Sequence, residues 1–117
     1  MIFLHGGLRD HYVRRYAEEE YDDTDAVLGR INSFGYSEFW FDSSPLWLRP
    51  QYSDFRMYKE QELLQVVGHT PVTKVMRNGN VVSCDVFSTD QSGRPIGTQE
   101  FPIIETTNWD IETVPGK

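Results

Sequence analysis

Two of the three histidines in the sequence stand in the same local setting. His5 follows the apolar run Ile2-Phe3-Leu4 and precedes two glycines, and His69 follows the run 63–67 and Gly68. An apolar run that ends at glycine is typical of a buried strand. If the two strands lie in one parallel sheet, both imidazoles reach its carboxyl edge, where open α/β sheets bind ligands. Because neutral imidazoles are good ligands for divalent metals, we interpret His5 and His69 as a candidate metal pair.

Spacing alone leaves a second interpretation open, in which each histidine ends a strand and is hydrogen-bonded locally. The repeated pairing with glycine favours a functional role, since a small backbone lets a metal or phosphate approach. The third histidine, His11, falls on a predicted helix without a matching partner, and we expect it at the surface. Cys84 is the single cysteine, which excludes an internal disulfide and a cysteine-based zinc cluster. Its apolar neighbours predict a small buried side chain.

An acidic stretch at residues 18–25 raises the question of calcium. A calcium loop needs oxygen ligands at alternate positions, a glycine at the sharp turn and a distal glutamate. The stretch has none of that spacing, so a solvated helix end and loop is the interpretation we adopt.

The composition bounds the class of protein. The 117 residues suit one domain, and 38% hydrophobic and 14% aromatic residues exclude general disorder. The net charge of −7 makes nucleic acid and anionic membranes poor partners. The segment 1–7 is too short for a signal peptide, and no stretch approaches membrane-spanning length, so we expect a cytoplasmic location.

Helical spacing follows the first apolar run. Tyr12, Val13, Tyr16 and Ala17 predict a helix over about 10–20 with Asp10 as its N-cap. A second helix is predicted over about 25–34, capped by Asp23 or Thr24. The aromatic stretch 34–47 predicts a loop with one helical turn.

Strand and turn signals follow the run 63–67. Asn78-Gly79 between apolar pairs predicts a hairpin with a type I′ turn. Ser92-Gly93 predicts another turn before a strand over 98–104. We therefore expect an α+β fold: a mixed sheet, a helical excursion after the first strand, and a C-terminal antiparallel meander. Residues 1–107 would form one domain and 108–117 a frayed tail.

Three segments resemble motifs of a known family, and they follow one another along the chain in the family's order. His5-Gly6-Gly7-Leu8 looks like the His-Gly-Gly motif of calcineurin-like metallophosphoesterases, the superfamily of Ser/Thr protein phosphatases and dinucleoside tetraphosphatases. Val67-Gly68-His69-Thr70-Pro71 resembles its Gly-His-Thr motif, and the segment 44–50 is similar to the Trp-x-Arg segment of the bacterial branch. The run 82–87 is similar to the closing strand of the fold, although Val86-Phe87 stands where the family often has glycine.

The resemblance implies a fold, a cofactor and site residues. The chain would be the C-terminal half of the metallophosphoesterase α/β sandwich. His5 and His69 would ligate the same one of two catalytic metals (Mn, Zn, Fe or Mg), and Arg49 would hold the phosphate oxygens. A planar guanidinium suits that task. Without the resemblance, Arg49 is equally well read as a surface arginine before Pro50.

The N-terminal motifs of the family do not occur in these residues: Asp-x-His, Gly-Asp-x-x-Asp-Arg-Gly and Gly-Asn-His-Glu are all lacking. The bridging aspartate and the ligands of the first metal therefore have no counterpart, and we expect the chain to be inactive alone.

Three hypotheses remain: a phosphatase fragment completed by a missing N-terminal half, a non-catalytic module that binds itself or another protein, and an enzyme of another type. For the last we find no nucleophile–base pair, nucleotide loop or Cys/His cluster. An uncovered strand at 2–4 and the aromatic residues Trp40, Phe41 and Trp47 favour a homodimer over a monomer.

Overall fold

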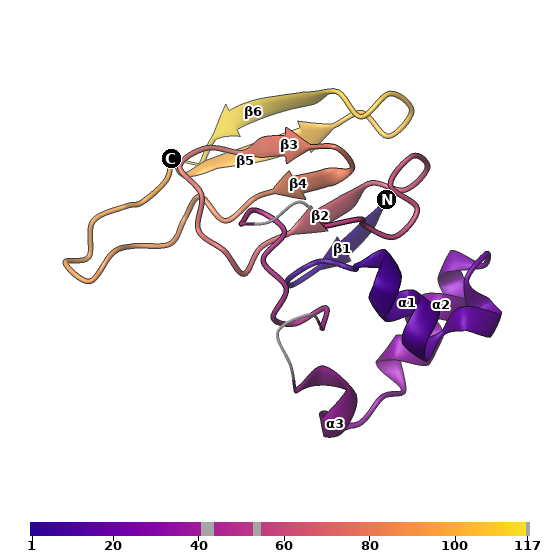
Figure 1. The fold of residues 1–117 in the computed structure, drawn as a ribbon. Helices are drawn as coiled ribbons and strands as arrows, with labels where there is room; N and C mark the ends of the chain where they lie inside the picture. The colour runs from indigo at the N-terminus through magenta and orange to yellow at the C-terminus, as the bar shows by residue number, and fades with distance from the viewer. Residues whose placement is uncertain (41–43, 53–54, 117) are drawn as a thin grey trace.

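A computed structural model describes residues 1–40, 44–52 and 55–116 (Figure 1). The order of elements is β1 (Ile2–Leu4), α1 (Asp10–Tyr16), the short 3₁₀ helix η1 (Glu18–Glu20), α2 (Thr24–Asn32), α3 (Tyr36–Phe39), β2 (Gln65–Val67), β3 (Met76–Asn78), β4 (Val81–Ser83), β5 (Glu100–Ile104) and β6 (Ile111–Pro115). The expected α+β fold with a mixed sheet is confirmed at this level.

The main sheet has four strands in the order β1-β2-β4-β3. β1, β2 and β4 are parallel, and β3 is antiparallel to β4. Leu4 lies opposite Val67 in the register of β1 and β2. Both strands therefore end at the same edge of the sheet. This is the arrangement we predicted for the strands before His5 and His69.

The helical excursion covers one face of this sheet next to β1 (Figure 1). Its core joins strand, helix and loop residues: Ile2, Leu8, Tyr12, Val13, Ala17, Val27, Ile31, Tyr58 and Leu63. The predicted first helix is divided at Ala17, whose φ of −144° leaves the helical region. Asp10 is the first helical residue and Arg9 the N-cap, so the predicted cap was one residue too late. The predicted cap of α2 is confirmed, because the Asp23 carboxylate accepts from the Ala26 amide.

The opposite face packs against the β5–β6 hairpin. Leu64, Val66 and Val82 contact Ile104, Trp109 and Ile111. β5 and β6 form a separate two-stranded sheet, so the expected single C-terminal meander is wrong in this respect. The expectation of a frayed tail from residue 108 was also wrong for Ile111–Pro115, which pairs with β5 and is anchored by the half-buried Ile111.

The predicted hairpin is present, but its turn is shifted by one residue. Asn78 belongs to β3 and pairs with Val81, which leaves Gly79 and Asn80 as the loop. Gly79 alone has a positive φ (59°), the pattern of a type II′ turn rather than the predicted type I′. The buried Asn80 amide donates to the carbonyls of Leu63 and Tyr58, which fixes this register. The predicted turn at Ser92-Gly93 is present, with Gly93 at φ 79°.

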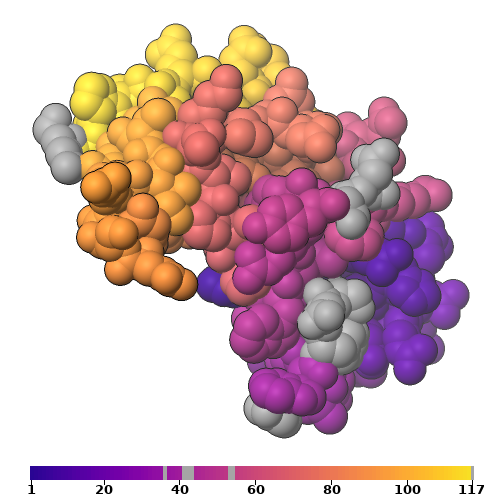
Figure 2. Space-filling view, turned by 60° about the vertical axis from the view of Figure 1, so that its left-hand side comes forward, coloured from indigo at the N-terminus to yellow at the C-terminus, as the bar shows by residue number. Residues whose placement is uncertain are grey.

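A third apolar cluster holds the segment between the helices and β2. Leu48 and Met57 pack on Val67 and Val81. Figure 2 shows the magenta surface that includes residues 44–52 between the indigo N-terminal part and the orange C-terminal part. α3 is the predicted helical turn, whereas Phe41 lies outside the described residues. In the described ranges, no helix is long and apolar enough to cross a membrane.

Candidate functional site

His5 and His69 lie side by side where β1 and β2 end. Their ring centroids are 4.5 Å apart, with the ring planes inclined by 52°. The Gly68 amide donates to the His5 carbonyl at 3.1 Å and continues the β1–β2 pairing as far as the histidines. The predicted adjacency of the two side chains is confirmed.

The backbone and side chain of His69 are both unusual. Its φ is 47°, in the left-handed region that non-glycine residues enter at a cost, and such residues often mark functional positions. Its Nε2 is enclosed and has no hydrogen-bond partner among the described residues. Burial, then the nearby Arg49 charge and then His5, lowers the pKa of the His69 imidazole. The neutral, ligating form is therefore favoured, with one nitrogen not engaged by the described protein.

Arg49 lies beside the histidines. Its Nη1 is 3.4 Å from the Thr70 hydroxyl oxygen, and its guanidinium lies 5.7 Å from the Tyr52 ring centroid. In the described part of the chain, Arg49 forms no salt bridge, since both ion pairs found there involve Asp10. Its charge is thus available to an anion at this edge of the sheet.

Gly6 fixes the segment that carries Arg49. The Gly6 amide donates to the Pro45 carbonyl at 2.7 Å. A Cβ at residue 6 would come within 2.8 Å of Leu48 O and 2.9 Å of Leu48 N. We expected the glycines beside the histidines to clear space for a ligand. Instead, Gly6 is required by close packing of the chain on itself, and nothing lies within 4 Å of a Cβ built on Gly68.

Trp47 forms an aromatic wall that we did not predict as part of the site. Its ring meets His69 edge-on at 5.8 Å, and Trp40 meets Trp47 at 6.3 Å. Trp47 is 45% exposed, so one part of the indole covers His69 while another part faces solvent. The segment was singled out for Arg49, and only the fold shows that its tryptophan contacts His69.

Gln65 is a second residue that we did not single out. It is fully buried in β2, where its side chain bonds both the amide and the carbonyl of Leu8. This contact fixes the turn that follows His5. The signal was present in the sequence as a lone amide within the apolar run 63–67.

The remaining candidates stay outside this site. His11 is exposed on α1, as expected. Cys84 is half-buried, and burial raises the pKa of its thiol. In the acidic stretch, the backbone carbonyls of Tyr21 and Asp22 accept from Tyr58 and Lys59. The acidic stretch therefore ends in a loop that these hydrogen bonds attach to the rest of the protein.

Two features of the site bear on metal binding. The enclosed Nε2 of His69 next to the His5 ring suits two ligands of one divalent ion. The described residues contain no group of three or more His, Cys, Asp or Glu side chains arranged to hold a metal. The histidine pair therefore fits part of a coordination shell, and any remaining ligands must come from elsewhere.

Comparison of the chain with family models, with curated proteins and with solved structures found no match in any of the three. The functional interpretation consequently rests on the motifs and on the geometry of the site.

Proposed function

We propose that these residues are the C-terminal part of a calcineurin-like metallophosphoesterase domain, with His5 and His69 as ligands of one divalent metal and Arg49 as the phosphate-binding residue. The observation that carries the proposal is the 4.5 Å contact of the two imidazoles, which come from separate motifs and meet at the carboxyl edge of parallel strands. The finer assignment to the half-sandwich of this family is part of the same proposal.

The residues of the chain have distinct tasks in this proposal. A bound divalent ion would supply Lewis-acid polarisation of a phosphoryl oxygen. Arg49 would bind the equatorial phosphate oxygens through its planar set of N–H donors. The Trp47 indole would keep bulk water from one side of His69, which strengthens the electrostatic interactions there.

The proposal also predicts what these residues lack. Two imidazoles supply no carboxylate charge, so the affinity for metal should be weak. In-line displacement with two metals needs an ion at both the attacking and the leaving oxygen. We propose that turnover requires the aspartate, asparagine and histidine motifs of an N-terminal half, whether in a preceding segment or on another chain.

Calorimetric titration with MnCl₂ tests the metal pair. We expect one ion per chain, with binding abolished in His5→Ala and in His69→Ala. His11→Ala is the matched control, because His11 is an exposed histidine on α1. Unchanged binding in both site variants would refute the pair as ligands.

A phosphatase assay tests the second part of the proposal. Hydrolysis of p-nitrophenyl phosphate in Mn²⁺ is expected only when an N-terminal half carrying the missing motifs is added. Turnover by these residues alone that disappears in His69→Ala would show that one metal position suffices.

A second candidate function is a non-catalytic module that associates with itself or another protein. The observation in its favour is the edge position of β1, whose Phe3 is 71% exposed. Metal binding that fails in the titration, together with self-association, would favour this alternative.

A further inference from the structure

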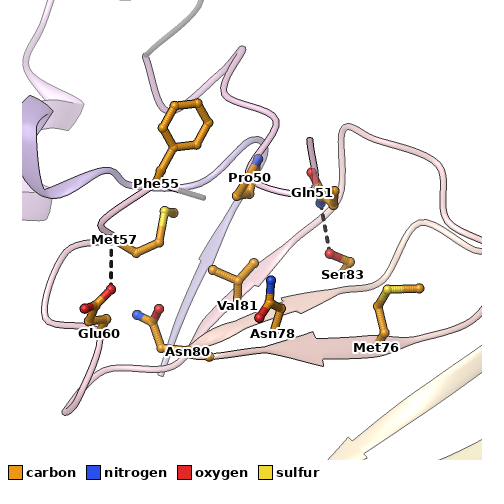
Figure 3. Close-up of a pocket in the computed structure, with 11 residues that line it drawn as sticks. Pro50, Gln51, Phe55, Met57, Glu60, Met76, Asn78, Asn80, Val81 and Ser83 are labelled. Carbon is orange, nitrogen blue, oxygen red and sulfur yellow. Dashed lines mark hydrogen bonds between the residues drawn. The ribbon is translucent and has the colours of Figure 1, made fainter. Parts of the chain in front are cut away.

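A hollow that no histidine lines lies between the β3–β4 hairpin and the segment that follows Arg49 (Figure 3). Its volume is about 170 Å³. Residues of the β3–β4 hairpin form one side, and five described residues form the other: Pro50, Gln51, Phe55, Met57 and Glu60. The hollow is small, so it suits a short group rather than a whole cofactor.

The middle of the hollow is apolar. Met57 and Val81 are buried there, and Met76 adds a half-exposed thioether chain. Figure 3 shows Met57 and Val81 between Glu60 on one side and Gln51 with Ser83 on the other. An aliphatic stem would replace water over these side chains favourably.

The polar groups at the rim are acceptors with unused capacity. Glu60 has one long hydrogen bond, from the Met57 amide at 3.4 Å, and forms no salt bridge with any described residue. The Gln51 amide donates to Ser83 at 2.9 Å, while its Oε1 is enclosed without a partner in the described chain. The Gln51 oxygen therefore has acceptor capacity that no described residue uses.

Glu60 is the one charged side chain among the described residues that line the hollow. These described lining residues include no lysine, arginine or histidine. Two arginines contact lining residues without lining the hollow themselves. Arg77 donates to the Gly79 carbonyl at 3.0 Å, and the Arg9 guanidinium stacks on the Phe55 ring at 4.7 Å. With a net charge of −7, the whole chain also attracts cations over anions.

We propose that this hollow binds an aliphatic cation, with the stem on Met57 and Val81 and the ammonium or guanidinium group at Glu60. Such a group occurs on free alkylamines and on the lysine or arginine side chains of a partner protein. The proposal is independent of the metal site, because none of its residues takes part in the His5–His69 contact.

Nuclear magnetic resonance titration of the ¹⁵N-labelled chain tests it at constant ionic strength. The probes are n-butylammonium, butyrate of the same length but opposite charge, n-butanol, and Nα-acetyl-lysine amide. Saturable shifts of the Gln51 and Asn78 side-chain amides are expected with butylammonium, in the millimolar range. If Nα-acetyl-lysine amide binds as well as butylammonium, the result points to a lysine side chain of a partner protein. If it binds more weakly than butylammonium, the result points to a free amine. Either result supports the proposal.

Two variants connect the binding to its charge. Glu60→Gln should weaken butylammonium binding by about two- to fivefold, the range expected for an ion pair with an exposed carboxylate. Glu62→Gln is the matched control, since this exposed carboxylate lies nearby but does not line the hollow. The proposal is overturned if no probe gives saturable shifts, if butyrate or butanol binds as well as butylammonium, or if Glu60→Gln has no effect.

Discussion

The Gln65 side chain brackets the backbone of Leu8: its Oε1 accepts from the Leu8 amide at 2.7 Å, and its Nε2 donates to the Leu8 carbonyl at 2.9 Å. Both residues are fully buried, so these bonds take the place of hydrogen bonds to water in the turn that follows β1. β2 is therefore joined to β1 by ladder hydrogen bonds and to the turn after His5 by side-chain hydrogen bonds.

Replacement of Gln65 by methionine should be strongly destabilising. Gln65→Met keeps the volume but leaves the buried Leu8 amide unsatisfied, at about 1–3 kcal/mol, whereas the Leu8 carbonyl still accepts from the Tyr58 amide at 2.9 Å. We expect the free energy of unfolding to fall by about 2 kcal/mol in urea denaturation. Gln91→Met, at an exposed turn position, is the control and should change stability by less than about 0.5 kcal/mol. Equal stability of the two variants would contradict the clamp.

A methyl group at Gly6 should displace the segment that carries Arg49. Gly6→Ala places a Cβ within 3.0 Å of Leu48 and Pro45 backbone atoms, which cannot move independently of Arg49. We expect a loss of about 1–3 kcal/mol in stability, as for other overpacked positions, and displaced backbone amide signals at residues 45–49.

Gly29→Ala provides the comparison for Gly6. This glycine lies inside α2, and nothing is within 4 Å of a Cβ built on it. Alanine should stabilise the helix there by about 0.5–1 kcal/mol. If Gly6→Ala lowers the free energy of unfolding and Gly29→Ala raises it, the effect of steric contact is separated from that of backbone entropy. A stabilising Gly6→Ala would contradict the close approach at Gly6.

Asp10 should make part of the stability depend on pH. Burial alone raises the pKa of this carboxyl, but hydrogen bonds from Tyr21 and Arg14 outweigh it and hold the pKa below the ordinary value of 3.8. A lowered folded-state pKa contributes stability that is present above pH 3.8 and lost as the pH falls through the folded value.

The Asp10→Asn variant measures this contribution. At pH 7 we expect a lower free energy of unfolding, because the charge-assisted hydrogen bonds from Tyr21 and Arg14 are weakened. The difference from the parent chain should shrink below about pH 4, where Asp10 itself becomes protonated. Asp22→Asn, at an exposed loop position, is the control. A difference that stays constant from pH 7 to pH 3 would argue against the charged form as its source.

The sequence predicted the features that local patterns determine. Apolar runs ended by glycine placed His5 and His69 at one sheet edge, and Asp23 was recognised as a cap because its task is local. The hairpin turn was misplaced because Asn80 binds carbonyls of the segment that precedes β2. β6 was missed because its residues become a strand only through pairing with β5. A contact with a distant segment decided the first case and pairing with the preceding strand decided the second. Neither is encoded in the pattern of the segment itself.

Self-association through β1 is the last prediction. Among the described strands, β1 pairs with β2 alone. Phe3 lies on the same sheet face as the β5–β6 hairpin, on the part that the hairpin does not cover, and is exposed. The other edge strand, β3, carries Arg77, and a charged edge resists pairing. We therefore expect two chains to associate through β1, the closed two-fold dimer being the commonest arrangement.

Sedimentation equilibrium at micromolar concentration should show a species heavier than 13.6 kDa for the parent chain and a monomer for Phe3→Lys. Phe101→Lys tests the other exposed aromatic face, on the outer side of β5, and should leave the dimer intact. A parent chain that sediments as a single 13.6 kDa species would show that β1 stays unpaired, and loss of the dimer in Phe101→Lys alone would move the interface to the β5–β6 hairpin.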